Sequence, residues 1–346
     1  MMEAQAKTLL RIENLQTHLH LSRGVVQAVD GVSFDLREGE AVGIVGESGS
    51  GKTMTGLSIL RLLPQVGAKI VGGSVELDGV NLLNLSEREL ERDWRGRRMS
   101  MVSQDPMTSL NPLFTIGDQV GAPLRYHRMA RSAEALRDAV VNGLRRVRIP
   151  AAESRLNAYP HQFSGGMRQR VVSAMALACS PRLLIADEPT SALDVTIQVQ
   201  LIELYRRLQA ETGLGIILIT HDLGTAAMLC KRIAVMYAGR VVEFGDVRTI
   251  FKSPRHPYTQ ALIDSIPQLG VERRRLYALP GQPPSLINPP KGCRFADRCA
   301  HRMAICDRYP PDFIDASGHR VACWLHRDTA TMTTPETVRE EPDNAA

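Results

Sequence analysis

The chain of 346 residues has few aromatic side chains and no long apolar segment. Tyr, Phe and Trp make up 5% of it, and no apolar run approaches the roughly 18 residues that a membrane-spanning helix needs. Its first residues, MMEAQAKTLLRIENLQTHLHL, show no continuous apolar stretch after a basic end, so we expect no signal peptide. These absences predict a cytosolic protein that reaches a membrane only through a partner, and structural disulfides are disfavoured there.

The charge pattern also lacks the features of a nucleic-acid site. The net charge of +5 allows attraction to nucleic acid or to an anionic membrane surface. However, no basic stretch is interleaved with aromatic residues, as single-strand binding requires. Arginine-rich pieces such as RDWRGRR and ERRRLY are therefore interpreted as solvated faces. The chain has no internal repeat and no sustained heptads.

Strands and helices alternate along the chain, which predicts an α/β fold with a parallel-sheet core. Short apolar, β-branched runs predict buried strands at 40–46, 182–189 and 214–222. Further strands are expected at 10–19, 29–40 and 72–82, with a hairpin at 237–246. Helices are expected at 54–63 and 131–149, and before the last buried strand, where Ile197, Leu201, Leu204 and Leu208 share a face.

Composition divides the chain into three parts. Residues 1–250 hold the predicted strands and helices, with a helical insertion at about 105–165, where strand signals vanish. Residues 251–330 are rich in proline and predict a small irregular extension on the domain surface. Residues 331–346 are predicted to form a disordered tail.

Residues 46–53, GESGSGKT, match the phosphate-loop pattern between a predicted strand and a predicted helix. Glycines let backbone N–H groups turn toward phosphate oxygens, and the helix N-terminus adds partial positive charge. Lys52 can reach the β and γ phosphates, and the Thr53 hydroxyl can bind Mg²⁺. We expect nucleoside triphosphate binding, which kinases, GTPases and many ATPases share, by Gly46, Glu47, Ser48, Gly49, Ser50, Gly51, Lys52 and Thr53.

Four shorter motifs accompany the phosphate loop. An apolar strand ends in Asp187 and Glu188, whose carboxylates can hold Mg²⁺ and orient a water molecule. The stretch FSGGMRQR precedes an apolar helix and offers a second anion-binding helix N-terminus. The remaining motifs are SQD at 103–105, SALD at 191–194 and THD around His221. Alone, an acidic strand end or a Ser-Gly-Gly turn is usually structural.

In their order and spacing, these motifs resemble the nucleotide-binding subunits of ABC transporters over about residues 8–250. The resemblance implies an ABC-type P-loop ATPase fold with a parallel core, an antiparallel β part, a helical insertion and ATP with Mg²⁺ at the site. It identifies residues 46–53 with the Walker A loop. Asp187 resembles the Walker B aspartate, a Mg²⁺ ligand together with Thr53, and Glu188 resembles the catalytic base.

The same resemblance implies roles for the other motifs. Gln104 corresponds to the glutamine that contacts Mg²⁺ and senses the permease, and His221 to the switch histidine. Asp194 belongs to the loop that crosses the subunit interface. The signature residues contact the γ-phosphate bound by the opposite subunit, and here they are Ser164, Gly165 and Gly166.

The adenine position departs from the family pattern. Family members usually stack adenine on an aromatic residue near the first strand. The corresponding stretch here, THLHLSRG, offers Leu19 and His20 and no Tyr, Phe or Trp. We therefore expect either weaker stacking of adenine or His20 as the substitute for the aromatic residue.

The segment SPRHPYTQALIDSIP and the proline-rich stretch after it resemble the C-terminal extension of oligopeptide and dipeptide importer ATPases. This resemblance implies a second similar ATPase subunit, two integral membrane permeases, an extracytoplasmic solute-binding protein and a place on the cytoplasmic face of the inner membrane. Peptides are the expected solute, with nickel, glutathione or another small solute as alternatives. A non-transport ABC ATPase acting on nucleic acid is disfavoured by the single cassette, so no direct nucleic-acid contact is expected.

Six cysteines fall into two groups. Cys179 and Cys230 lie in apolar helical contexts and are interpreted as buried thiols. The other four lie in the loop-rich extension, separated by five, six and sixteen residues: Cys293, Cys299, Cys306 and Cys323. Four thiolates can bind an iron–sulfur cluster or a zinc ion. The spacing matches neither the usual zinc knuckle nor the ferredoxin run.

Two alternatives to a cluster remain open at this point. His301, His319 and His326 lie nearby and keep zinc as one alternative. Four unligated thiols are the other, although free cysteines gain nothing from clustering. The subfamily resemblance favours a [4Fe–4S] cluster of structural role, since metal–thiolate bonds can replace a core in a segment with few apolar residues.

Overall fold

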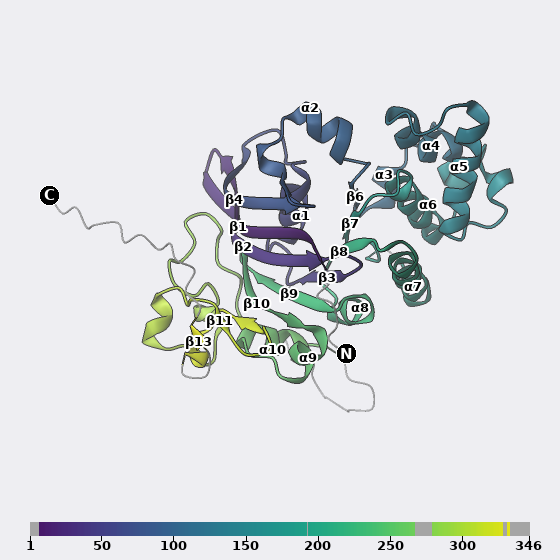
Figure 1. Ribbon diagram of the computed structural model, residues 1–346. Coiled ribbons are helices and arrows are strands. Elements are labelled where there is room, and N and C mark those ends of the chain that lie inside the picture. Colours follow the sequence, from purple (N-terminus) through teal and green to yellow (C-terminus); the bar gives the residue numbers. More distant parts are fainter. Residues whose placement is uncertain (1–6, 192, 267–278, 328–330, 333–346) are drawn as a thin grey trace.

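A four-stranded antiparallel sheet forms one layer of the protein (Figure 1). The computed structural model describes residues 7–191, 193–266, 279–327 and 331–332. The strands of this sheet run in the order β2-β1-β4-β5. Their bounds are β1 Thr8–Leu21, β2 Gly24–Arg37, β4 Ala68–Leu77 and β5 Val80–Asn81. The predicted antiparallel part is thereby confirmed.

The second sheet contains the parallel core, in the order β9-β3-β8-β7-β6. The strands are β3 Ala41–Val45, β6 Met99–Val102, β7 Leu183–Asp187, β8 Gly215–Thr220 and β9 Arg232–Tyr237. Every residue of β3, β7 and β8 is buried, as expected of parallel strands covered on both faces. The predicted parallel core is confirmed, and β6 is a strand that the sequence patterns did not reveal.

Helices cover the parallel sheet. The helix α1 (Lys52–Leu60) follows β3 and lies between the two sheets, in contact with β1, β2, β7 and β8. The helix α7 (Val195–Thr212) buries Leu201, Leu204 and Leu208, as its periodicity predicts. Short helices are α2 Glu87–Glu89, α8 Leu223–Leu229, α9 Val247–Lys252 and α10 Pro257–Asp264.

The predicted helical insertion stands to one side of the sheets (Figure 1). Within its predicted bounds lie α3 (Pro106–Ser109), α4 (Ile116–Tyr126) and α5 (Ala133–Arg146), and α6 (Gly165–Leu177) follows where the predicted insertion ends. Thr115 and Ser132 begin α4 and α5 by accepting hydrogen bonds from backbone N–H groups three residues ahead. Buried side chains of α4, α5 and α6 belong to one apolar cluster that continues to β7 and β8.

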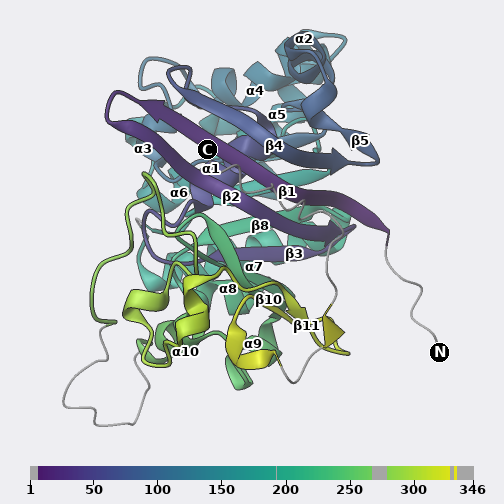
Figure 2. The same ribbon diagram turned by 90° about the vertical axis from the view of Figure 1, so that its left-hand side faces the viewer.

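The extension is more ordered than predicted, because it adds strands to the second sheet (Figure 2). β10 (Arg240–Asp246) pairs with β9 and with β12 (Arg320–Val321), and β11 (Phe313–Ile314) follows. Thr331–Met332, inside the predicted disordered tail, forms β13 beside β11. The rest of that tail, 333–346, lies outside the described residues. Among the described helices, none is long and apolar enough to cross a membrane.

Candidate ATP site

The phosphate loop joins β3 to α1 at the carboxyl edge of the parallel sheet. Gly51 has a φ of +101°, and a Cβ atom there would lie 2.2 Å from the carbonyl oxygen of Ala28, so only glycine fits. The buried Lys52 donates from Nζ to the carbonyl oxygens of Gly46 and Glu47, each at 2.9 Å. Burial lowers the pKa of Lys52, an effect that the carboxylates of Glu188, Asp187 and Glu47 oppose.

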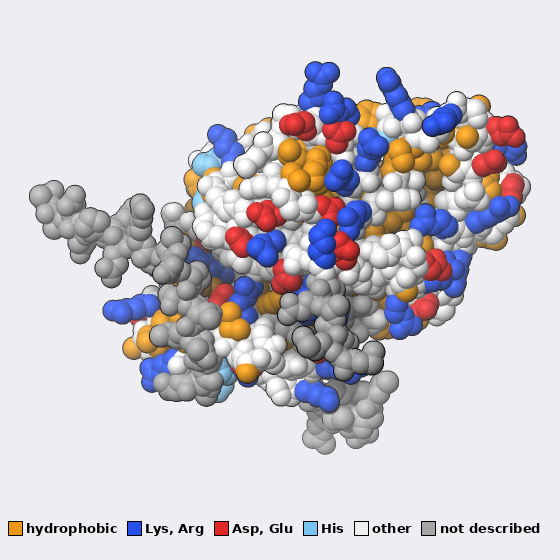
Figure 3. Space-filling view, viewed as in Figure 1, with side chains coloured by type: hydrophobic (Ala, Val, Ile, Leu, Met, Phe, Trp, Pro, Cys, Tyr) orange, Lys and Arg blue, Asp and Glu red, His pale blue; other side chains and the backbone are white. Residues whose placement is uncertain are grey.

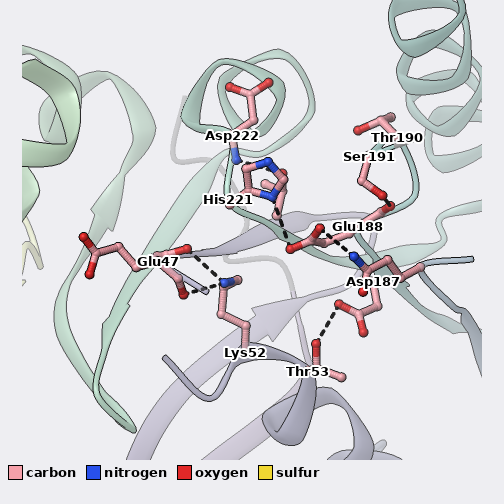
Figure 4. Close-up of polar contacts among 12 residues, drawn as sticks. Glu47, Lys52, Thr53, Asp187, Glu188, Thr190, Ser191, His221 and Asp222 are labelled. Atoms are coloured by element: carbon pink, nitrogen blue, oxygen red, sulfur yellow. Dashed lines mark hydrogen bonds and ion pairs between the residues drawn. The ribbon is translucent and has the colours of Figure 1, made fainter. Parts of the chain in front are cut away.

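A carboxylate at the end of β7 faces the start of α1. Thr53 donates from Oγ1 to Oδ1 of Asp187 at 3.2 Å (Figure 4). Burial raises the pKa of Asp187, and the neighbouring charge of Glu188 raises it further, against the opposing effects of Thr53 and Lys52. Hydroxyl and carboxylate oxygens are ligands that Mg²⁺ prefers. The donor chemistry of Thr53 and Asp187 therefore fits that ion.

Glu188 is the residue on which two other loops converge. Its φ of +44° is left-handed, a conformation that costs about 1–3 kcal/mol outside glycine and is concentrated at functional sites. Its backbone N–H donates to Ile219 at 2.8 Å, which fixes the turn against β8. Its carboxylate accepts from Nε2 of Gln104 at 3.2 Å. The same carboxylate lies 3.2 Å from Nδ1 of His221 (Figure 4).

These loops surround a cavity of about 520 Å³. The predicted site residues that line it are Ser48, Gly49, Gly51, Lys52, Thr53, Gln104, Glu188 and His221. Residues from four sequence motifs thus meet at one cavity, and Asp187 reaches it through Thr53. Sequence reasoning missed the lining residues Ala28, Met54 and Leu286.

Leu286 comes from the extension and lines the cavity. The segment around it lies along β2, where Gln27 donates its N–H to the carbonyl of Leu286 at 2.9 Å and Val26 bridges to Ile287. Neither Leu19 nor His20 belongs to the described lining of the cavity. The expected substitute, His20, is exposed, and its backbone N–H donates to Gly67 at 2.7 Å.

The other predicted ATP residues do not belong to the described lining of this cavity. Ser164 caps α6 by accepting from the N–H of Met167 at 3.3 Å. Asp194 caps α7 by accepting from the N–H of Ile197 at 3.0 Å. A Cβ atom on Gly166 would lie 2.6 Å from Cγ2 of Ile197, whereas one on Gly165 would meet open space. Ser164, Gly166 and Asp194 thus have structural roles, and Ser164, Gly165 and Asp194 are exposed.

The cysteines divide as predicted. Cys179 and Cys230 are buried. The four cysteines of the extension line one small cavity, together with His256 and His301: Cys293, Cys299, Cys306 and Cys323. Burial, together with the neighbouring thiols, raises the pKa of Cys293 to about 11 and that of Cys323 to about 12. Within the described ranges, no group of three or more His, Cys, Asp or Glu side chains is placed to hold a metal ion.

The histidines named with the cysteines have different surroundings. Only His301 of the three lines the thiol cavity among its described residues. His319 is buried beside Glu243, with Nε2 at 2.7 Å from Oε1. Nε2 of His326 lies 2.9 Å from the carbonyl oxygen of Arg255. His256, which the sequence did not single out, lines the cavity instead.

Comparisons with known proteins agree with this geometry. The family model described as ABC transporter matches residues 29–191, and the model described as oligopeptide/dipeptide transporter, C-terminal region, matches residues 242–306. The dipeptide transport ATP-binding protein DppD of Bacillus subtilis is 50% identical, over 93% of this chain and 96% of its own. The oligopeptide transport ATP-binding protein OppD of Salmonella typhimurium is 46% identical, over 92% and 94%.

A solved structure agrees as well. The ATP-binding cassette MJ0796, a dimer in a post-hydrolysis state bound to ADP and phosphate, has a TM-score of 0.62 and 30% identity. It covers 69% of this chain and 99% of its own. The match covers cassette and extension in the relatives, and the P-loop fold in the solved structure. This chain therefore belongs to the ATP-binding subunits of ABC transporters, in the oligopeptide/dipeptide subfamily, and is an ATPase.

Proposed function

We propose that this chain is the ATP-hydrolysing subunit of an importer that takes up peptides through membrane permeases. The observation that carries the proposal is the convergence of Lys52, Gln104, Glu188 and His221 on one cavity in a chain with the peptide-transporter extension. The relatives named for dipeptide and oligopeptide transport favour peptides over nickel, glutathione or nucleic acid.

In the proposed reaction, the chain's residues bind and orient ATP and water. Backbone N–H groups of residues 46–53 and the Lys52 ammonium bind the phosphates. Mg²⁺, when bound, neutralises phosphate charge, and Thr53, Asp187 and Gln104 would hold it. Glu188 accepts the proton of the attacking water. His221 and Gln104 fix the Glu188 carboxylate, which each approaches at 3.2 Å.

A second, similar ATPase subunit would complete the site. Ser164, Gly165 and Asp194 are exposed outside the cavity, where they can face a nucleotide bound by a partner. The dimeric cassette of known structure supports this arrangement. We expect Ser164→Ala to lower ATPase activity of the assembled pair while ATP binding to the isolated chain is unchanged. Full activity of the pair would contradict the assignment.

The helical insertion is the proposed permease contact. The segment between Gln104 and α4 carries Leu113 and Phe114, which are 81% and 55% exposed. Figure 3 shows hydrophobic side chains on the surface over this insertion. Because large exposed apolar side chains mark interaction sites, a permease segment docked here could act on Glu188 through Gln104.

Co-purification tests the assembly. The full chain, expressed with its genomic neighbours, should bring down two integral membrane permeases, and peptide uptake should require it together with an extracytoplasmic solute-binding protein. The double variant Leu113→Ser, Phe114→Ser should lose the permeases and keep ATP binding. Val66→Ser is the matched control, because Val66 is 85% exposed elsewhere on the cassette. Permeases retained by the double variant would refute this contact.

The same proposal covers location and domain limits. We place the chain on the cytoplasmic face of the inner membrane, held there by the permeases. We also propose a nucleotide-binding domain at 1–250, with its helical part at about 105–165, and an extension at 251–330. Membrane fractions should contain the chain only when the permeases are present, and limited proteolysis should cut the chain near residue 250, between the two domains.

A separate observation favours a metal centre in the extension. We propose that Cys293, Cys299, Cys306 and Cys323 bind a [4Fe–4S] cluster, with zinc as the alternative. Their meeting at one cavity supports either metal, and thiolates suit both, although the described side chains would have to move before they could hold an ion. The free room is about 10 Å³, near that of one water molecule, so a cluster requires the surrounding side chains to move outward. Bound metal would cross-link the segment.

Metal analysis of anaerobically purified protein tests this centre. About four irons per chain with matching sulfide, lost in Cys299→Ser and kept in Cys179→Ser, would support the cluster. One zinc ion in a colourless protein, lost in the same variant, would support the alternative. Metal absent from the wild-type chain, or retained in Cys299→Ser, would refute the assignment.

A further inference from the structure

One buried arginine of the extension binds a carboxylate of the phosphate loop. Arg298 ends the short 3₁₀ turn Ala296–Arg298, and its side chain is 6% exposed. Its Nη1 donates to Oε2 of Glu47 at 2.8 Å and its Nη2 donates to Oε1 at 3.1 Å. Such two-pronged, charge-assisted hydrogen bonds are among the strong ones in proteins. The pair joins residues 251 positions apart in the chain.

Other contacts fix Arg298 itself. Its Nη1 also donates to the hydroxyl of Tyr237 at 3.2 Å, and its Nε donates to the carbonyl of Pro280 at 2.9 Å. The guanidinium lies over the rings of Tyr237 and Phe295. The arginine therefore presents a fixed fork to Glu47, because its own position is set by β9 and the extension.

Glu47 is held at three points. Arg298 binds its carboxylate, the hydroxyl of Tyr258 accepts from its backbone N–H at 2.8 Å, and Lys52 donates to its carbonyl at 2.9 Å. Figure 4 shows the Glu47 side chain pointing away from the Lys52 ammonium. Glu47 is outside the described lining of the ATP cavity. Its side chain thus connects the loop to the extension, and does not extend toward the nucleotide.

We infer that Arg298 is a positioning residue for ATP: by holding Glu47, it keeps the phosphate loop in the conformation that presents its N–H groups and Lys52 to the phosphates. The inference rests on the proposed ATP site and deepens it. The simpler alternative is that the pair only anchors the extension to the cassette. A few backbone angles set the geometry of the phosphate loop. Releasing Glu47, its second residue, should therefore lower the affinity for ATP.

Calorimetric titration of the full chain with ATP, paired with steady-state kinetics, distinguishes a positioning role of Arg298 from a role as an anchor of the extension. Arg298→Gln should weaken ATP binding about tenfold, the loss expected for a charged hydrogen-bonded pair. KM should rise similarly, and kcat at saturating ATP should change far less. Arg298→Lys should recover part of the affinity, since it keeps the charge and loses the fork.

A double-mutant cycle tests the route. Glu47→Gln should weaken ATP binding as Arg298→Gln does, and the double variant should be no worse than either. Tyr258→Phe, which keeps the ring and removes one hydroxyl, provides a gentle variant if Arg298→Gln fails to fold, and we expect a threefold to fivefold loss of affinity. Arg302→Gln is the matched control, because Arg302 pairs with exposed Asp297 and Asp307 near the same turn.

Each outcome has a definite meaning. Unchanged ATP affinity in Arg298→Gln and Tyr258→Phe, with only a lower melting temperature, would reduce the pair to an anchor and overturn the inference. Additive losses in the cycle would show that Arg298 does not act through Glu47. If the wild-type chain itself bound no ATP, the proposed function would be wrong. This outcome is distinct from failure of the inference, because it is seen without any variant.

Discussion

The cassette and the extension are stabilised in different ways. The cassette places its site residues at the ends of β3, β7 and β8, strands that are buried along their whole length and packed by aliphatic side chains. The extension packs on the cassette through an apolar cluster that includes Tyr258 and Phe295, and buried polar pairs, such as Glu243 with His319 and Asp30 with Arg294, join it as well. Apolar packing tolerates substitution, whereas a buried charge that loses its partner is costly. We therefore expect substitutions of the catalytic residues to lower kcat, and substitutions of the buried polar pairs to lower the free energy of unfolding.

The largest expected effect comes from the cassette. Glu188→Gln keeps the hydrogen-bonding shape of the side chain and removes the proposed base, so kcat should fall about 10²–10⁴-fold. ATP affinity, melting temperature and metal content of the extension should be unchanged, since Glu188 contacts no residue of the extension in the described contacts. Single-turnover kinetics of the wild type and of Glu188→Gln measure this difference in the rate of hydrolysis. Near-normal turnover would remove Glu188 from its assigned role.

The second effect should come from the buried polar pairs that attach the extension to the cassette, and it should leave the chemistry intact. The fully buried Glu243 accepts from the N–H groups of Arg255 and His256 at 2.8 and 3.0 Å and from His319 at 2.7 Å. Glu243→Gln turns one acceptor into a donor facing donors. We expect it to lower the free energy of unfolding by about 2–4 kcal/mol, measured by urea denaturation. Glu38→Gln, at an exposed pair with Arg182, should cost at most about 1 kcal/mol.

The effect of Glu243 should depend on pH in a defined direction. Burial raises the pKa of Glu243, but the hydrogen bonds from His319 and the two backbone N–H groups outweigh it and hold the pKa below its ordinary 4.5. A carboxyl whose pKa is lowered on folding stabilises the fold above its unfolded pKa and loses that effect as pH falls through the folded value. The gap between wild type and Glu243→Gln should thus shrink below about pH 4.5. An equal difference in the free energy of unfolding at pH 7 and pH 4 would show that the charge of Glu243 does not cause the effect.

The same contrast explains what the sequence could predict. Strands such as β3, β7 and β8 are continuous apolar runs, and the motif residues sit beside them in the chain, so both were visible as local patterns. The short strand β6 was missed because its four residues, MSMV, follow the basic RGRR and carry little β-branched character. The two-residue strands β11 and β12 are too short for any periodicity.

Contacts over long sequence distances left no such pattern. Arg298 and Glu47 are one such pair, and no sequence pattern near either residue predicts the contact with the other. The four clustered cysteines are an exception, because their type and local density predicted that they would meet, and they line one cavity. The lining of the ATP cavity shows the limit of local patterns: the stretch around Leu19 and His20 gives no indication of Leu286, which comes from the extension.

The smallest expected effect lies where the two regions meet. Leu286 is half-buried and lines the same cavity as Ala28 and Gly49, so we expect it to form an apolar wall for the nucleotide base. Leu286→Ala should weaken ATP binding by about fivefold, corresponding to roughly 1 kcal/mol of apolar contact. Inorganic triphosphate, which has no base, should bind the variant and the wild type equally in competition titrations.

The control for this last change is the neighbouring residue. Ile287 bridges to Val26 on β2 and is outside the described lining of the cavity, so Ile287→Ala removes extension packing without altering the wall. Its ATP affinity should match that of the wild type. If Leu286→Ala weakened triphosphate and ATP alike, the residue would be acting on the phosphate loop, as Arg298 does, and the base would have to be held by the cassette alone. Selective loss of ATP would instead mean that cassette and extension build the nucleotide site together, one binding phosphates and the other the base.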